Sequence, residues 1–490
     1  MVKRFLLSAA AVAAITGNVI AFDVISENPE ITNGNEVEEM NITSENANDT
    51  YLIGTYEANN TGLIFPAYYA GNGWESTLKI INTKDRSVVA KVVLFDREKS
   101  EEVLDFTIYL SGKDVFVADI TVDSNGKVKV ISTDNSAPSS TPNTMASDDN
   151  PLEVTPKQYF TGKGNVGYIE VIPMVTYNGD IHGMYLRNAY KDFSKEVRLL
   201  DPNADYINFS RGVVLDNKVR VPYVNITSID EIAEFGTSDI EGALSGYIRI
   251  TNVANGRDMI INGFPVWFAT EDENGDDLAL VYLEGEKASL LDVAIDTNGS
   301  NASAVGYNFT AVIESIKKLN ALNTSSGEVK EVYLTYGEAE FNNMYALITQ
   351  PYKRVAVQQS LRDNNTAAVG SYWNGVGGST AAVSNYGTLK LVADVYDNHE
   401  NKMDWLQFSP ASTPSIHLPY ELGTTGTSES NNTQLPYYLK LAEDNLGYKE
   451  GFVILKNATD SLIPGIITQM IATKPGSQIL LNWHWPTVRD

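Results

Sequence analysis

Short runs of alternating apolar and polar residues, separated by turn signals, dominate the chain from Gly62 onward. Residues 77–82 and 103–110 alternate in this way, and the polar turn 123–126 separates two further runs. A period of two places successive side chains on opposite faces of a strand, so these segments predict half-buried β-strands. The sequence therefore predicts a mainly β fold of immunoglobulin-like or jelly-roll-type β-sandwich domains, with a few short helices.

Changes in composition predict the domain organisation. Residues 22–61 contain many acidic residues and no Lys or Arg, and residues 132–152 are rich in Ser, Pro and Asp. Such segments bury too little apolar surface to offset the entropy cost of ordering them. We expect a signal peptide at 1–21, a flexible acidic arm at 22–61, a β-sandwich domain at 62–131, a linker or long loop at 132–152, a β-rich domain with short helices at 153–355 and a C-terminal β-rich domain at 356–490.

Two helices and one hairpin are predicted in the middle of the chain. Ser228 and Glu231 form a capping box before a short helix that would include Phe235 and stop at Gly236. Residues 309–322 place apolar side chains on one face of a longer helix. Residues 264–283 are predicted to form a hairpin with an acidic loop at 271–277.

Three segments begin with glycine, then an aromatic residue, then branched residues. They start at Gly167, Gly246 and Gly451. The similarity indicates either repeated sandwich domains or the ordinary way in which a core strand begins. The irregular spacing of the three segments favours the second interpretation.

The N-terminal residues predict an export signal. Lys3 and Arg4 precede an apolar run from Phe5 to Ile20, and we expect cleavage after Ala21. No other segment of the sequence reaches the roughly eighteen uninterrupted apolar residues of a spanning helix, so we expect no transmembrane segment after cleavage. The predicted location is extracellular or on the cell surface, with the periplasm as the alternative.

The chain contains no cysteine and has a formal net charge of -26. The lack of cysteine excludes disulfides, thiolate metal sites and a cysteine nucleophile. A strongly negative field repels nucleic acid and anionic lipid and attracts cations. We therefore expect no nucleic-acid partner.

Catalytic motifs are not evident in the sequence. The four histidines share no metal-ligand spacing, and neither a phosphate-binding loop nor a Gly-x-Ser-x-Gly elbow occurs. We therefore expect a protein that is not an enzyme and that uses no cofactor other than calcium. An acidic loop is the candidate calcium site, since it concentrates hard oxygen ligands; the alternative is a solvated hairpin turn. Its ligands would be Asp272, Asn274, Asp276 and Asp277.

Aromatic residues in two glycine-rich loops are candidate glycan-binding residues. They are Tyr69 and Trp74 in the first loop, and Tyr372 and Trp373 in the second. The alternative is that these rings anchor their loops on the core. Some Asn-x-Ser/Thr sequons also have an acidic residue two positions earlier, a form that bacterial glycosylation often requires. These predicted glycosylation sites are Asn41, Asn59, Asn298 and Asn431.

Residues 65–83 and 102–115 carry a family resemblance. The sequences Phe-Pro-Ala-Tyr-Tyr, Thr-Leu-Lys-Ile-Ile-Asn-Thr and Glu-Val-Leu-Asp-Phe-Thr-Ile-Tyr-Leu-Ser lie within them. Here the chain resembles a group of uncharacterised exported β-rich proteins of Gram-negative bacteria. The resemblance implies export, a β-rich fold and a surface or periplasmic location, and it supplies no catalytic residue.

Three functional hypotheses are consistent with these sequence features. The first is a structural cell-surface protein, such as a surface-layer, sheath or filament subunit, that self-assembles or binds other surface proteins. The second is a glycan-binding adhesin or carbohydrate-binding module. The third is an exported hydrolase, since the many carboxylates could include an acid–base pair.

Overall fold

The computed structural model describes part of the chain: residues 62–98, 100–177, 181–200, 213–215, 235–236, 243–255, 257–266, 279–281, 284, 331–336, 344–351, 389–403, 415–418, 421–424, 442, 444, 446–457 and 466–471. The chain divides into two compact units, residues 1–50 and 51–490, and every described residue belongs to the second. The predicted signal peptide, acidic arm and 309–322 helix lie outside the described residues.

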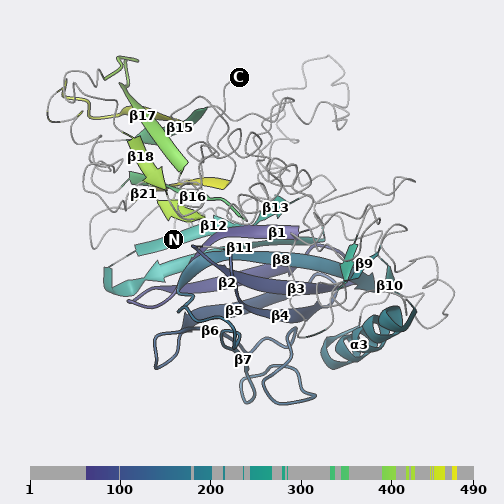
Figure 1. Cartoon of the computed structure of the whole chain (residues 1–490). Helices are drawn as coiled ribbons and strands as arrows, with labels where there is room; N and C mark the ends of the chain where they lie inside the picture. The colour runs from purple at the N-terminus through teal and green to yellow at the C-terminus, as the bar shows by residue number, and fades with distance from the viewer. Residues whose placement is uncertain are drawn as a thin grey trace, which may run out of the picture. The chain divides into compact units, whose positions relative to one another are not determined.

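Twelve of the described strands form two six-stranded antiparallel sheets (Figure 1). Sheet 1 has the order β13–β1–β8–β3–β4, with β10 also paired to β8. Its strands are β1 (Gly62–Tyr69), β3 (Ser87–Asp96), β4 (Glu102–Leu110), β8 (Val166–Tyr177), β10 (Phe235–Gly236) and β13 (Phe264–Val266). Sheet 2 has the order β12–β11–β2–β5–β6–β7. Its strands are β2 (Glu75–Asn82), β5 (Val115–Val122), β6 (Val128–Ser132), β7 (Leu152–Val154), β11 (Leu244–Asn252) and β12 (Arg257–Asn262).

A single hydrophobic core joins the inner faces of the two sheets. Alternate residues of β3 and β4 from sheet 1, such as Val92 and Phe106, belong to the same buried cluster as Leu78 and Phe116 from sheet 2. The Phe106 and Phe116 rings lie 5.8 Å apart between centroids. The prediction of a mainly β protein is confirmed, and the two sheets enclose a core as the layers of a sandwich do.

The two sheets differ in their outer faces. In β2 and β11, buried residues alternate with part-exposed ones, as expected for strands with one solvated face. Every residue of β4 is buried, and β3 and β8 are buried along almost their whole length. Helix α3 (Gly183–Leu200) contacts β4, and β14 (Ala279–Val281) contacts β8. Later parts of the chain therefore cover the outer face of sheet 1.

Prolines coincide with the irregular positions of sheet 1. The register between β1 and β8 shifts between Phe65 and Tyr68, a stretch that includes Pro66. The register between β3 and β8 shifts where Ala90 lies opposite Pro173. Proline has no N–H to donate to the ladder, and it is tolerated in sheets mainly at such bulges and at edges.

Residues 132–152 connect strands of the same sandwich, because strands before this segment pair with strands after it. β7 pairs with β6, β8 pairs with both β1 and β3, and β11 pairs with β2. Ser136, Ala137 and Ala146 of this segment are buried. The segment is therefore a packed loop, and the sheets that begin within the predicted 62–131 domain continue through strands of the predicted 153–355 domain.

The remaining described strands form three smaller sheets. These are β14 with β9 (Val213–Leu215); β15 (Glu331–Tyr336), β20 (Gly451–Asn457), β17 (Leu389–Asp397) and β18 (Ser415–Leu418); and β19 (Leu422–Thr424), β16 (Met344–Thr349) and β21 (Ile466–Ile471). A short 3-10 helix, η2 (Val253–Asn255), follows β11. Across the described residues, no helix is both long and apolar enough to cross a membrane.

Two local predictions are wrong. Phe235 lies in strand β10, where it pairs with Tyr177, and not at the end of a helix. β13 and β14 do not pair as the two arms of a hairpin, because β13 pairs with β1 and β14 pairs with β9. In both cases pairing with a strand distant in sequence overrides the local pattern.

Candidate functional site

The outer face of sheet 2 is partly exposed along its strands. It consists of the residues of β2, β5, β6, β7, β11 and β12 that alternate with the core residues, and we call it the open face. It presents apolar side chains at Ile81, Val115, Val117, Tyr247 and Ile260, all at least partly exposed. Val115 retains 40% of its exposure and lies directly opposite Ile81.

Most charged side chains of the open face are paired laterally. Arg249 donates two hydrogen bonds to Asp258 on β12, at 2.8 and 2.7 Å. The Thr77 hydroxyl donates to Asp119 on β5 at 2.8 Å, and these residues are directly opposed. Cross-strand pairs of this kind stabilise a sheet and occupy the polar groups within its own plane.

The lateral pairing continues toward both edges of sheet 2. Lys129 lies 3.7 Å from Glu153 on β7. The Lys79 amine lies 5.4 Å from the centroid of the Tyr247 ring, a cation–π contact between β2 and β11. The open face has three basic side chains (Lys79, Lys129, Arg249) against four acidic ones (Glu75, Asp119, Glu153, Asp258). It is thus nearly neutral in a chain whose net charge is -26.

The first predicted aromatic loop forms the turn between β1 and β2. Gly71 and Trp74 exchange two backbone hydrogen bonds of 2.9 Å around Asn72 and Gly73, which both have positive φ. Two positive φ values are the signature of a type I′ turn, and Asn-Gly is its preferred sequence. The Tyr69 and Trp74 rings lie 5.6 Å apart and pack against the hydrophobic core. This placement favours the anchoring interpretation of the two rings.

The other predicted site residues lie outside the described residues. They are the calcium ligands Asp272, Asn274, Asp276 and Asp277, the aromatic residues Tyr372 and Trp373, and the sequons Asn41, Asn59, Asn298 and Asn431. In the part of the chain that the structure describes, no three His, Cys, Asp or Glu side chains lie together where they could hold a metal ion.

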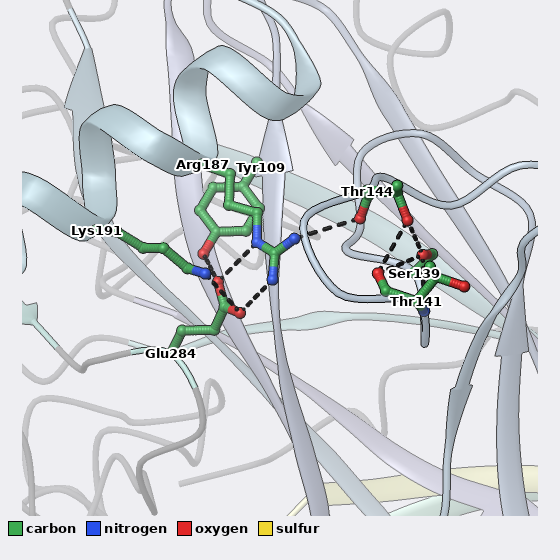
Figure 2. A network of polar contacts seen from close by, with 7 residues as sticks. All are labelled: Tyr109, Ser139, Thr141, Thr144, Arg187, Lys191 and Glu284. Atoms are coloured by element: carbon green, nitrogen blue, oxygen red, sulfur yellow. Dashed lines mark hydrogen bonds and ion pairs between the residues drawn. The ribbon is translucent and has the colours of Figure 1, made fainter.

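A polar cluster that the sequence patterns did not predict joins α3 to sheet 1 (Figure 2). Arg187 donates two hydrogen bonds to Glu284, at 2.9 and 2.6 Å. The Tyr109 hydroxyl donates to the same carboxylate at 2.8 Å, and the Lys191 amine lies 3.4 Å from it. A bidentate arginine–carboxylate pair is among the strongest polar contacts in proteins.

The protonation of this cluster follows from burial and hydrogen bonding. Burial tends to raise the pKa of Glu284, but hydrogen bonds from Arg187 and Tyr109 favour the carboxylate more, so its pKa is lowered. The pKa of Tyr109 is raised, first by burial and then by the charge of Glu284. A carboxylate that already accepts from several donors is a poor general base, so the geometry supports a structural role.

The Arg187 cluster also holds the loop at 132–152. The remaining guanidinium nitrogen of Arg187, Nη1, donates to the Thr144 carbonyl at 3.3 Å. Thr144 donates to the Thr141 carbonyl at 2.9 Å, and its hydroxyl also contacts that of Ser139, as Figure 2 shows. Arg187 therefore links α3 to Glu284 and to this loop, beside β4 at the edge of sheet 1.

A second buried polar cluster lies on the outer face of sheet 1. Lys91 of β3 forms an ion pair with Asp105 of β4, and the side chains of both are fully buried. Lys157 forms an ion pair with the other oxygen of Asp105 and lies 3.8 Å from Glu102. The Tyr159 hydroxyl donates to Glu102 at 2.7 Å. One sequence signal for this cluster existed, because Lys91 is the one charged residue within the apolar run 88–95.

Comparisons with family models, with curated proteins and with solved structures found no match. Function is therefore inferred from the geometry of the open face and of the two buried clusters.

Proposed function

We propose that the protein is an exported structural component of the cell surface, and that its copies assemble through the open face of sheet 2. The observation that carries the proposal is the contrast between this face and the rest of the chain. Charges on the open face are almost balanced and paired laterally, while the whole chain has a net charge of -26. Two copies would repel each other least where the net charge of the contacting surfaces is closest to zero.

The chemistry of the open face supports a second copy as the occupant. Its charged groups are paired within the sheet, so few of them would need new partners when the face is covered. Between them stand part-exposed branched and aromatic side chains, including Val115 and Tyr247, which lose water favourably in an interface. A surface layer, a sheath and a filament are the kinds of assembly that repeat such a contact.

The test compares charged substitutions on the open face with one elsewhere. The double variant Val115→Glu and Tyr247→Glu adds negative charge to the open face. The control Tyr185→Glu adds charge on α3, where Tyr185 is 79% exposed. Sedimentation velocity of the signal-free protein over a range of concentrations should show association for the unchanged protein and the control only.

Two outcomes contradict the proposal. One is a monomer at every concentration, with or without calcium. The other is association that the double variant retains while its circular dichroism matches that of the unchanged protein.

A further inference from the structure

The Lys91–Asp105 pair has an unusual position for two charged residues. Both side chains have no exposed surface, and both lie on the outer face of sheet 1. Lys91 is opposite Thr107 and Asp105 is opposite Val93 in the ladder between β3 and β4. Lys91 and Asp105 are therefore diagonal neighbours on one face, which is why the amine reaches the carboxyl group.

This environment is unfavourable for two full charges. Removing ions from water is expensive, and an ion pair compensates only when further hydrogen bonds satisfy its remaining donors and acceptors. Neither the Lys91 amine nor the Asp105 carboxyl oxygens make a hydrogen bond of normal geometry within the described residues. An amine nitrogen and a carboxyl carbon held in contact are the nucleophile and the electrophile from which an amide bond forms.

Two neighbouring groups complete the arrangement. Lys157 contacts the Asp105 oxygen that Lys91 does not contact, and it keeps 24% of its side-chain exposure. Its backbone N–H donates to the Val103 carbonyl at 2.8 Å, which fixes its segment along the edge of β4. A cation at this oxygen would stabilise negative charge that develops on it. The Lys157 amine also lies 3.8 Å from Glu102, so it contacts two carboxylates.

We propose that Lys91 and Asp105 react with each other to form an intramolecular isopeptide bond. The Lys91 nitrogen attacks the side-chain carboxyl carbon of Asp105, and Lys157 stabilises the oxygen that becomes negative. Two protons pass from the Lys91 ammonium nitrogen to the departing oxygen of Asp105, which leaves as water. A C–N bond forms, a C–O bond breaks and one water molecule leaves, so no oxidant or other co-reactant is needed.

The product removes both charges from the buried face. An amide N–H replaces the ammonium group, and the Thr107 hydroxyl, which has no hydrogen-bond partner among the described residues, lies opposite Lys91 and is available to accept from it. The bond would also link β3 to β4 covalently in a chain that has no cysteine for disulfides. An intramolecular cross-link constrains the unfolded chain in the way a disulfide does.

Mass spectrometry of the purified protein without its predicted signal peptide tests the proposal. After the N-terminus is determined, the intact mass should be lower than the sequence requires by the mass of one water molecule. Protease digestion should yield a branched peptide that joins Lys91 to Asp105. Lys91→Arg should restore the full mass, whereas Lys157→Arg should keep the bond, since it keeps a cation beside Asp105.

Digestion of the unchanged protein decides the question even if a variant fails to fold. Separate linear peptides containing Lys91 and Asp105, with none branched, would overturn the proposal. A branch that starts at Lys157 would overturn the choice of amine. Neither result depends on whether copies of the protein assemble, so this proposal and the proposed function are tested independently.

Discussion

Arg187 and Arg249 make similar bidentate contacts in different environments. Arg187 is 8% exposed and its partner Glu284 is 24% exposed, whereas Arg249 and Asp258 are 53% and 41% exposed. Water and salt screen an exposed pair, and a buried partner that loses its pair cannot be rehydrated easily. The same chemical change should therefore have a much larger effect at Arg187.

We predict that Arg187→Ala lowers the free energy of unfolding by about 1–3 kcal/mol, because it leaves the Glu284 carboxylate without its strongest donor. The matched control Arg249→Ala should cost at most about 1 kcal/mol. Urea denaturation of both variants measures the two effects. Equal losses would show that the Arg187 cluster contributes no more than a surface pair.

Glu284 should also make stability depend on pH. Its pKa in the folded protein is lowered from an ordinary value of 4.5, so the unfolded chain binds its proton more readily. The stabilisation from Glu284 is therefore fully present above pH 4.5, and it is lost as the pH falls through the folded-state pKa.

The measurement is the difference in unfolding free energy between the unchanged protein and Glu284→Gln, taken at several pH values. This difference should shrink as the pH falls below 4.5. A difference that is constant from pH 7 to acid would contradict the ionised Glu284 described for the Arg187 cluster.

At the scale of elements, alternation predicted strands well when one face of the strand is solvated. β2 and β5 lie where the alternating runs predicted them, and their polar positions are part-exposed. Residues 103–110 alternate equally well, yet β4 is buried on both faces because α3 lies against it. The local sequence pattern of a strand does not show whether a segment distant in sequence covers its outer face.

Helix α3 was missed, although a signal was present. Leu186 and Tyr190, both fully buried, are four residues apart, as on one face of a helix. The partners of Arg187 could not be predicted from sequence, because Glu284 is 97 residues away. The candidate calcium site, the second aromatic loop and the sequons remain predictions.

The three similar glycines have a common physical explanation. A Cβ atom at Gly167, Gly246 or Gly451 would lie 1.8, 2.2 or 2.1 Å from a backbone carbonyl oxygen of the neighbouring strand. These distances are far inside van der Waals contact. Each of the three strands therefore approaches its neighbour at a position where only glycine fits.

We predict that Gly246→Ala destabilises the protein by roughly 1–3 kcal/mol, since the added methyl group forces β11 away from β2. Ser245→Ala, one residue earlier on the same strand, should change stability by about 0.5 kcal/mol or less. Thermal unfolding of the two variants gives the comparison. Similar stabilities would mean that the two strands are not so closely spaced.

At the scale of the whole molecule, the charge of -26 opposes association everywhere except where it is locally balanced. We therefore expect association to strengthen as sodium chloride is raised from low to physiological concentration, because screening weakens the general repulsion. Light scattering against salt concentration measures this effect. Association that weakens steadily with salt would indicate an interface made of opposite charges and not the nearly neutral open face.

Electron microscopy of the purified, signal-free protein and of the native cell surface tests most directly whether copies assemble through the open face of sheet 2. Contacts through this face predict an ordered lattice, sheath or fibre that is lost in the Val115→Glu and Tyr247→Glu variant. Dispersed single particles at all concentrations, together with a cell surface that lacks any array containing the protein, would contradict such an assembly.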